Sequence, residues 1–226
     1  ECDLQDQSMA FGYGSSRFDG DKRAVESKDM GPFIKTEMTR CIHCTRCVRF
    51  SSEISGNDEI GSIGRGHDME ITTYLDQAVE SELSGNVIDL CPVGALTSKP
   101  YAFSARPWEL NKTETIDIMD AMGSNIRIDS KGLRVMRVLP RLNEDINEEW
   151  ITDKTRFFWD GLNNQRIDKP YKRVDGILKP TSWNSALELA KEKISNSKSE
   201  KISALSGDLV DIETVYALKK LMKNIG

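Results

Sequence analysis

Three cysteines stand at a strict spacing of three in the first quarter of the chain. They are Cys41, Cys44 and Cys47, within the stretch R-C-I-H-C-T-R-C-V-R-F at residues 40–50. A Cys-x2-Cys-x2-Cys run wraps a short backbone loop around one object, with the thiolates pointing inward and the intervening amides able to donate hydrogen bonds to sulfur. A cubane [4Fe–4S] cluster has four iron corners, and each corner needs one thiolate. The run therefore predicts three ligands of such a cluster and requires a fourth from elsewhere.

Cys91 is predicted to be that fourth ligand. In two-cluster ferredoxins the run continues as C-x2-C-x2-C-x3-C-P, and its last cysteine serves the other cluster. The corresponding position in this chain is Ser51. Cys91, however, is followed by Pro92 in C-P-V-G-A-L, which is the ferredoxin-like end of such a run without its other cysteines. With the three cysteines of the run, Cys91 completes one four-thiolate set.

Structural zinc is the alternative metal for four cysteines. Zinc sites favour two C-x2-C pairs on separate turns, and three thiols in one run plus a distant C-P match that geometry poorly. His43 lies between two of the thiols, and its side chain is expected to point away from the metal. Three nearby arginines could partly neutralise an anionic cluster or could be ordinary surface charges: Arg40, Arg46 and Arg49.

Cys2 stands outside this set. From the residues alone it is either a buried free thiol or a ligand of some other site. The run G-S-I-G-R-G at 61–66 is not a G-x-G-x-x-G fingerprint and does not open a helix, so it is interpreted as a turn. No arrangement of acid, base and nucleophile indicates catalysis, and we expect no catalytic residue in this chain.

The composition excludes several classes of protein. The chain has 226 residues, with 36 acidic and 31 basic side chains and a net charge of −5. It therefore lacks the basic excess that is usual in nucleic-acid binders. No stretch approaches the roughly 18 to 20 apolar residues of a membrane span, and the first residues lack the features of a signal peptide. Because the chain starts without methionine and ends on an apolar helical pattern, we expect it to be an internal piece of a longer protein.

The pattern of elements indicates an α+β fold in three parts. The first part, residues 1–105, is Gly-rich and holds every cysteine; residues 69–75 in it are predicted to form a strand. The second, residues 106–165, is predicted to be a small β-rich domain. Its expected strands lie at 115–118, 125–129 and 133–138, with a hairpin turn at 130–132.

The third part, residues 166–226, is predicted to be the start of an α/β domain. A link with the turn residues Asp175 and Gly176 precedes a helix at 183–194, which Thr181 or Ser182 could cap. A strand and its loop are expected at 202–209, followed by a final helix with apolar residues from Ile212 to Met222.

The sequence resembles the large iron–sulfur subunit of respiratory complex I, the proton-pumping NADH:quinone oxidoreductase, whose mitochondrial form is the 75-kDa subunit. The resemblance covers essentially the whole chain and is most specific in the first hundred residues. The segments that carry it lie at 1–14, 33–50, 85–103, 106–110 and 147–157.

This resemblance implies electron transfer through the [4Fe–4S] cluster on the four-thiolate set, within the chain from flavin toward quinone. It implies as partners the flavin-bearing, NADH-oxidising subunit and the downstream iron–sulfur subunits, with no nucleic acid and no direct membrane span. It also implies a peripheral location, on the cytoplasmic side of a bacterial inner membrane or on the matrix side of the mitochondrial inner membrane.

The same family places a second [4Fe–4S] cluster nearby, held by one histidine and three cysteines in an H-x3-C-x2-C-x5-C run. Cys2 matches the last cysteine of that run, so the resemblance makes it a metal ligand. The other ligands would precede Glu1, and this second cluster is expected to be incomplete in the chain.

From about Trp108 the chain is similar to the small iron–sulfur domain that precedes the large fold of molybdopterin oxidoreductases. In the active enzymes that domain carries four cysteines, whereas here no cysteine follows Cys91. We therefore expect neither a cluster nor molybdopterin chemistry there, and we expect the region to act as scaffold.

Two other functions remain as alternatives. One is the iron–sulfur module of a NAD-reducing or iron hydrogenase, although an iron hydrogenase should continue into further cysteines. The other is a structural zinc-binding protein in which the cysteines only stabilise the fold. Metal content distinguishes the second alternative from a redox function.

Overall fold

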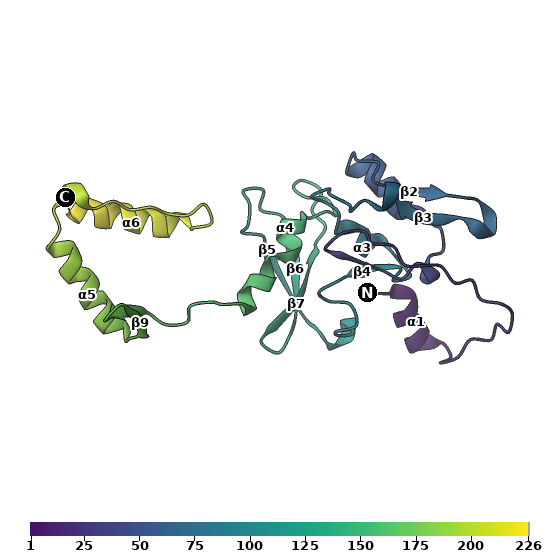
Figure 1. Ribbon diagram of the computed structural model, residues 1–226, viewed down its shortest axis with the longest axis horizontal. Coiled ribbons are helices and arrows are strands. Elements are labelled where there is room, and N and C mark those ends of the chain that lie inside the picture. The colour runs from purple at the N-terminus through teal and green to yellow at the C-terminus, as the bar shows by residue number, and fades with distance from the viewer. Residues whose placement is uncertain (226) are drawn as a thin grey trace. The chain divides into compact units, whose positions relative to one another are not determined.

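The computed structural model describes residues 1–225, and the chain divides into two compact units at the junction of Trp159 and Asp160. Each unit is described by itself. The helices and strands of the first unit are α1 (Asp3–Phe11), β1 (Ile34–Thr36), α2 (Arg46–Arg49), β2 (Ile60–Ile63), β3 (Glu70–Thr73), α3 (Asn86–Leu90), β4 (Leu96–Ser98), β5 (Asn111–Ile116), β6 (Asn125–Lys131), β7 (Arg134–Pro140) and α4 (Asp153–Phe157). Between α1 and β1 the chain runs a long way without helix or strand (Figure 1).

Two short antiparallel pairs build the part of this unit that holds the cysteines. β1 pairs with β4, and β2 pairs with β3. They enclose a hydrophobic core formed by Met30, Ile34, Met38, Phe50, Ile60, Ile71, Val79, Val87, Ile88 and Leu96. Three of the cysteines, Cys41, Cys47 and Cys91, pack against this core. The predicted ligands therefore lie on a close-packed base, which limits how far they can move.

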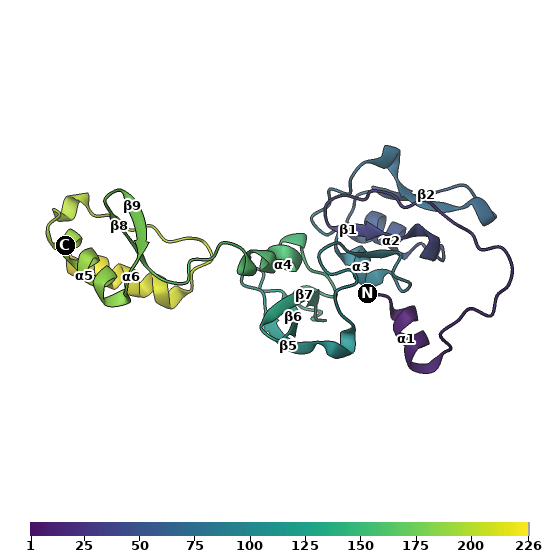
Figure 2. The same cartoon turned by 60° about the horizontal axis from the view of Figure 1, so that its bottom comes forward.

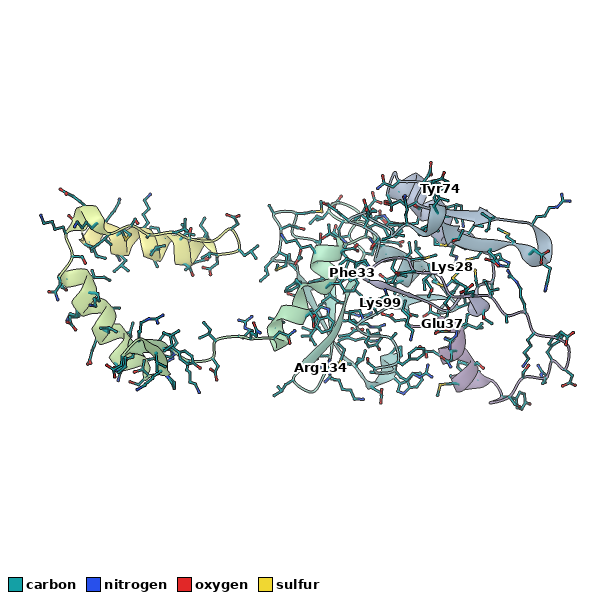
Figure 3. All side chains as sticks on the ribbon, viewed as in Figure 1. Lys28, Phe33, Glu37, Tyr74, Lys99 and Arg134 are labelled. Carbon is teal, nitrogen blue, oxygen red and sulfur yellow. The ribbon has the colours of Figure 1, made fainter. Side chains whose placement is uncertain are left out.

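A three-stranded antiparallel sheet in the order β5-β6-β7 forms the rest of the first unit. Ile126 of β6 and Val138 of β7 pack with Ile151 and Trp159 in a second core cluster. The helix α4 packs against β7. Phe157 of this helix stacks on Phe33, labelled in Figure 3, with ring centroids 4.4 Å apart. This contact joins the cysteine-bearing part to the sheet.

The second unit contains β8 (Tyr171–Val174), β9 (Ile177–Pro180), α5 (Trp183–Ser195) and α6 (Ile212–Ile225). β8 and β9 form a hairpin beside α5 (Figure 2), and Lys172 Nζ lies 3.4 Å from Ser185 Oγ. Ser182 caps α5 by accepting a hydrogen bond from the Ser185 amide. Apolar side chains of α6 such as Ile212 and Tyr216 are exposed. None of the helices in residues 1–225 is long and apolar enough to cross a membrane.

Most of the predicted elements are present. The strand predicted at 69–75 is β3, the hairpin predicted around residue 131 is formed by β6 and β7, and the helices predicted from 183 and 212 are α5 and α6. The hairpin turn is shifted slightly, because β6 continues to Lys131 and the chain turns at Gly132. The predicted α+β class is confirmed.

Two sequence predictions are wrong. Residues 202–207 form no strand, because among the described residues no strand pairs with them and strand formation depends on such pairing. The run at 61–66 is not only a turn, because Gly61–Ile63 belong to β2 and only Gly64 and Gly66 have positive φ. Cross-strand pairing with β3 outweighs the low β-propensity of glycine here.

Candidate metal centre

The loop that carries the first three cysteines has an unusual backbone. It connects a 3-10 turn at Met38–Arg40 to α2, and two of its residues, His43 and Thr45, have φ of +54° and +57°. Non-glycine residues seldom adopt this left-handed conformation, which costs of order 1 kcal/mol or more. These two residues with positive φ flank Cys44, so the backbone changes direction on both sides of it. Such local strain indicates a loop shaped for a purpose other than stability.

Cys91 reaches the same place from the other direction. It follows the last residue of α3, and its amide donates to the carbonyl oxygen of Val87 at 3.1 Å. Pro92 cannot continue the helix, and the chain turns away through Gly94, whose φ is +63°. The thiol of Cys91 is therefore presented at the C-terminal end of a helix that is itself packed in the core.

The four cysteines of the predicted set line one small cavity. Its walls are otherwise mainly apolar, and the residues around it are Met38, Cys41, Ile42, Cys44, Thr45, Arg46, Cys47, Ile71, Cys91, Val93, Ala95 and Leu96. All four are free thiols. No three His, Cys, Asp or Glu side chains within residues 1–225 are grouped closely enough to share a single metal ion. The shared cavity groups the four thiols around a common space.

Burial dominates the electrostatics of these thiols. It raises the pKa of Cys47 to about 12, with a further increase from the neighbouring Cys91 and a small opposing effect of the Val48 amide. Burial also raises the pKa of Cys41, whereas a hydrogen bond from the His43 amide and the charge of Arg23 act to lower it. Buried thiols of this kind become thiolates only when a strong positive charge, such as that of bound metal, compensates for desolvation.

His43 turns its ring away from the cavity, as the sequence predicts. Its Nε2 lies 2.7 Å from Nη1 of Arg23, while its backbone amide donates to Cys41 Sγ at 3.4 Å. The sequence analysis missed Arg23, which is 20 residues away along the chain. His67, in contrast, is exposed in a short turn at Gly66–Asp68.

Cys2 lies outside this cavity. Its thiol is buried and caps α1 by accepting a hydrogen bond from the Gln5 amide at 3.4 Å. It lines a separate cavity of about 310 Å³ together with polar residues that include Arg40, Arg106 and Glu109. The Cys91 loop is close, because the Leu4 amide donates to the carbonyl oxygen of Pro92 at 3.0 Å. Cys2 and the four-thiol set therefore line separate cavities that are close to each other.

A buried polar cluster, which the sequence analysis also missed, holds the helix before Cys91. Asn86 is fully buried; its side chain donates to the Ile151 carbonyl oxygen at 2.8 Å and accepts from the Ile151 amide at 3.1 Å. Arg156 donates to Asn86 Oδ1 at 3.1 Å and to Asp89 Oδ2 at 2.6 Å. Asp153 beside them accepts from the Ser84 hydroxyl and the Gly85 amide, and its pKa is raised, chiefly by burial.

Three family models match the chain in succession. They are described as NADH-quinone oxidoreductase subunit 3, ferredoxin-like domain (residues 31–97), NADH-ubiquinone oxidoreductase NDSU1/NuoG-like, 4Fe-4S domain (residues 110–160), and molybdopterin oxidoreductase (residues 166–226). The first of them contains Cys41, Cys44, Cys47 and Cys91.

Similar proteins are found in bacteria, fungi and plants. The chain is 57% identical over 226 residues to the G-type subunit of NADH-quinone oxidoreductase from Rickettsia felis, covering 100% of this chain and 34% of that protein. It is 58% identical over 230 residues to the mitochondrial NADH-ubiquinone oxidoreductase 78 kDa subunit of Neurospora crassa, covering 100% and 31%. It is 59% identical over 227 residues to the mitochondrial NADH dehydrogenase [ubiquinone] iron-sulfur protein 1 of Solanum tuberosum, again covering 100% and 31%.

The chain belongs to the NuoG-like family of NADH-quinone oxidoreductase subunits. It spans about a third of the length of the curated relatives it matches. A crystal structure of an NAD+-reducing [NiFe]-hydrogenase also aligns, with 28% sequence identity over 46% of each chain, but its TM-score of 0.39 is too low to bear on function.

One family description does not fit the residues that are present. The model that matches residues 110–160 describes a 4Fe-4S domain, yet this chain has no cysteine beyond Cys91. A thiolate-held cluster cannot form there. In this member of the NuoG-like family the segment instead supplies the β5-β6-β7 sheet and Arg156, which contacts the helix leading to Cys91.

Proposed function

We propose that Cys41, Cys44, Cys47 and Cys91 hold a [4Fe–4S] cluster through which this chain transfers electrons in NADH:quinone oxidoreductase. The observation that carries the proposal is the single cavity lined by all four thiols. The subunit names of its relatives favour this enzyme over the hydrogenase alternative. When bound, the cluster supplies the redox chemistry by accepting and releasing one electron at a time.

The residues of the chain bind and tune the group. The four thiols supply one ligand for each iron corner. Apolar neighbours such as Ile71 and Leu96, which are buried, exclude water from the cavity, and solvent exclusion is one of the factors that set a cluster potential. The His43 amide donates to Cys41 Sγ and favours the thiolate form. No residue of the chain needs to act as an acid, base or nucleophile.

The spacing of the four cysteines also favours a polynuclear cluster over zinc. In a zinc site all four sulfurs lie about 2.3 Å from one atom, so they crowd around a point. In a cubane each thiolate binds a different iron, and the sulfurs stand apart around the cluster. Three cysteines in one run plus a distant fourth match the second case better than the two C-x2-C pairs that zinc sites favour.

Cys2 is proposed as a ligand of a second [4Fe–4S] cluster whose histidine and remaining cysteines are not in this chain. Its burial and its position beside a separate cavity support this assignment. The domain limits 1–105, 106–165 and 166–226 are likewise proposed; the three matched segments fall within them.

The partners follow from the proposed function. A cluster that passes electrons from flavin toward quinone needs a donor and an acceptor, so we propose contacts with the flavin-bearing subunit and with downstream iron–sulfur subunits. The proposed location is peripheral, on the cytoplasmic side of a bacterial inner membrane or the matrix side of the mitochondrial one.

The test is anaerobic reconstitution of the 226-residue chain with iron and sulfide, followed by dithionite reduction and EPR. About four irons and four sulfides with one reduced cubane signal are expected. Absence of that signal, with zinc bound to the protein as isolated, would contradict the proposal and favour the structural-metal alternative.

Two variants check the ligand assignment. Cys47→Ser removes one of the four thiolates and is expected to abolish the complete cluster. His43→Ala keeps the backbone amide that bonds to sulfur and is expected to retain nearly the full iron content. Equal iron loss in both variants would show that the assignment of ligands is wrong.

A further inference from the structure

Arg23 is the residue by which the long segment after α1 first contacts the cysteine loop. Residues 12–22 are all exposed, whereas Arg23 is half-buried. Its Nη1 lies 2.7 Å from His43 Nε2, and its Nη2 donates to the carbonyl oxygen of Met69 at 2.5 Å. A planar guanidinium held by two partners on different segments has a fixed position.

The charge of this pair resides on Arg23. An arginine side chain has only donors, so His43 Nε2 accepts in this hydrogen bond. Arg23 is a permanent positive charge, because an arginine side chain stays protonated in proteins.

Both ends of His43 act on the same site. Its ring is held by Arg23, and its backbone amide donates to Cys41 Sγ at 3.4 Å. Because His43 adopts the left-handed conformation with φ of +54°, its amide direction depends on what holds the side chain and loop in place. Arg23 thus supports the hydrogen bond to this sulfur while its charge favours the Cys41 thiolate.

Further contacts fix the segment that carries Arg23. The Val25 amide donates to Thr39 Oγ1 at 3.2 Å, and Thr39 Oγ1 donates to the Val25 carbonyl oxygen at 3.2 Å. Lys28, labelled in Figure 3, forms an ion pair of 3.5 Å with Glu70 at the start of β3. Arg23 is therefore placed by the segment as well as by its own two hydrogen bonds.

The other arginines near the cysteines differ from Arg23. Arg40, Arg46 and Arg49 are all exposed, although Arg46 also borders the four-thiol cavity. Exposed charges are screened by water and salt. A half-buried charge is screened less, so it acts more strongly on a buried redox group.

We propose that Arg23 tunes the cluster held by Cys41, Cys44, Cys47 and Cys91 and raises its reduction potential. This inference rests on the proposed function. Reduction adds one electron to the cluster and makes the site more negative, so a fixed positive charge stabilises the reduced form relative to the oxidised form. The ordered His43 amide acts in the same direction, because a hydrogen bond to a cluster sulfur also stabilises the added charge.

The experiment is a mediator-equilibrated redox titration of the reconstituted chain, monitored by EPR, with iron and sulfide counted in every sample. The variants are Arg23→Gln, Arg23→Lys and, as a control, Arg49→Gln, which removes an exposed arginine from α2. Arg23→Gln is expected to keep its iron and sulfide and to titrate at a more negative potential than the wild type. Arg23→Lys keeps the charge, and its reduction potential is expected to be closer to that of the wild type. Arg49→Gln is expected to have the wild-type potential.

Several results would overturn this role for Arg23. One is a wild-type potential in Arg23→Gln with full iron content; another is an equal shift in Arg49→Gln. If the reduction potential shifts as far in Arg23→Lys as in Arg23→Gln, the charge of Arg23 is not what raises the potential. Iron loss from both Arg23 variants beside a loaded wild type would make Arg23 an assembly residue. Absence of a cubane signal in the wild type would instead refute the proposed function itself.

Discussion

Gly94 has a backbone φ of +63°, and a Cβ placed on it would lie 2.7 Å from the Cβ of Cys2 and 2.9 Å from the carbonyl oxygen of Glu1. Both facts require glycine, since the conformation disfavours a side chain and the space for one is occupied. Gly94 lies three residues after Cys91. It therefore allows the loop of the four-thiol cavity to approach Cys2 closely.

Gly94→Ala is expected to lower the free energy of unfolding by about 2–4 kcal/mol. The left-handed conformation costs an alanine about 1–2 kcal/mol, and forcing a methyl group into packed atoms costs about 1–3 kcal/mol. Gly132→Ala is a matched control, because Gly132 has φ of +61° and no atom within 4 Å of the added Cβ. Urea unfolding of both variants checks this prediction. If both variants lose the same free energy of unfolding, the close contact of Gly94 with Cys2 does not contribute to the cost of Gly94→Ala.

At the scale of elements, α3 is the connection between the cysteine-bearing part and the sheet. It is short, Asn86–Leu90, and its position depends on side chains of residues 151–156 rather than on its own length. A five-residue helix has little stability in isolation. The cysteine-free segment thus positions Cys91, which gives it a structural role in a metal site to which it contributes no ligand.

Arg156→Met is expected to destabilise the first unit by about 2 kcal/mol, because it removes the partner of Asp89 and one of the two donors to the buried Asn86 Oδ1. It is also expected to reduce the iron retained after reconstitution, since Cys91 loses its support. Lys131→Met is the control: it breaks the exposed ion pair with Glu109 and should cost less than about 1 kcal/mol. Chemical unfolding and iron counts measure both effects. Full iron retention in Arg156→Met would show that α3 holds its position without this arginine.

At the scale of the whole molecule, metal is expected to stabilise only one of the two units. All five cysteines lie in Glu1–Trp159, and a ligand that binds only the folded state stabilises the part that folds around it. Stripping the iron should increase amide hydrogen exchange in residues 1–159 and leave residues 160–225 unchanged. Peptide-resolved hydrogen exchange with and without the cluster tests this. A matching increase in both units would show that they unfold as one.

Local patterns predicted much of this molecule, while long-range contacts could not be predicted. The spacing of Cys41, Cys44 and Cys47 and the C-P at Cys91 were enough to group four thiols that the fold brings to one cavity. Alternating apolar residues likewise predicted β6 and β7. Arg23 and the Asn86–Arg156 cluster left no local pattern, since their partners lie 20 to 70 residues away along the chain. The strand expected at 202–209 was wrong because strand formation depends on a pairing partner that no local pattern reveals.

The support of Cys91 by Arg156 also has a consequence for the timing of biosynthesis. The first three thiols precede Arg156 by more than a hundred residues. At about 5–20 residues per second, the ribosome needs roughly 5–20 s to make that stretch. During this interval the Cys41–Cys47 loop exists without a fixed fourth partner. The nascent chain therefore passes through a period in which it carries three of the four thiols of the set but lacks the contact that fixes the helix before Cys91.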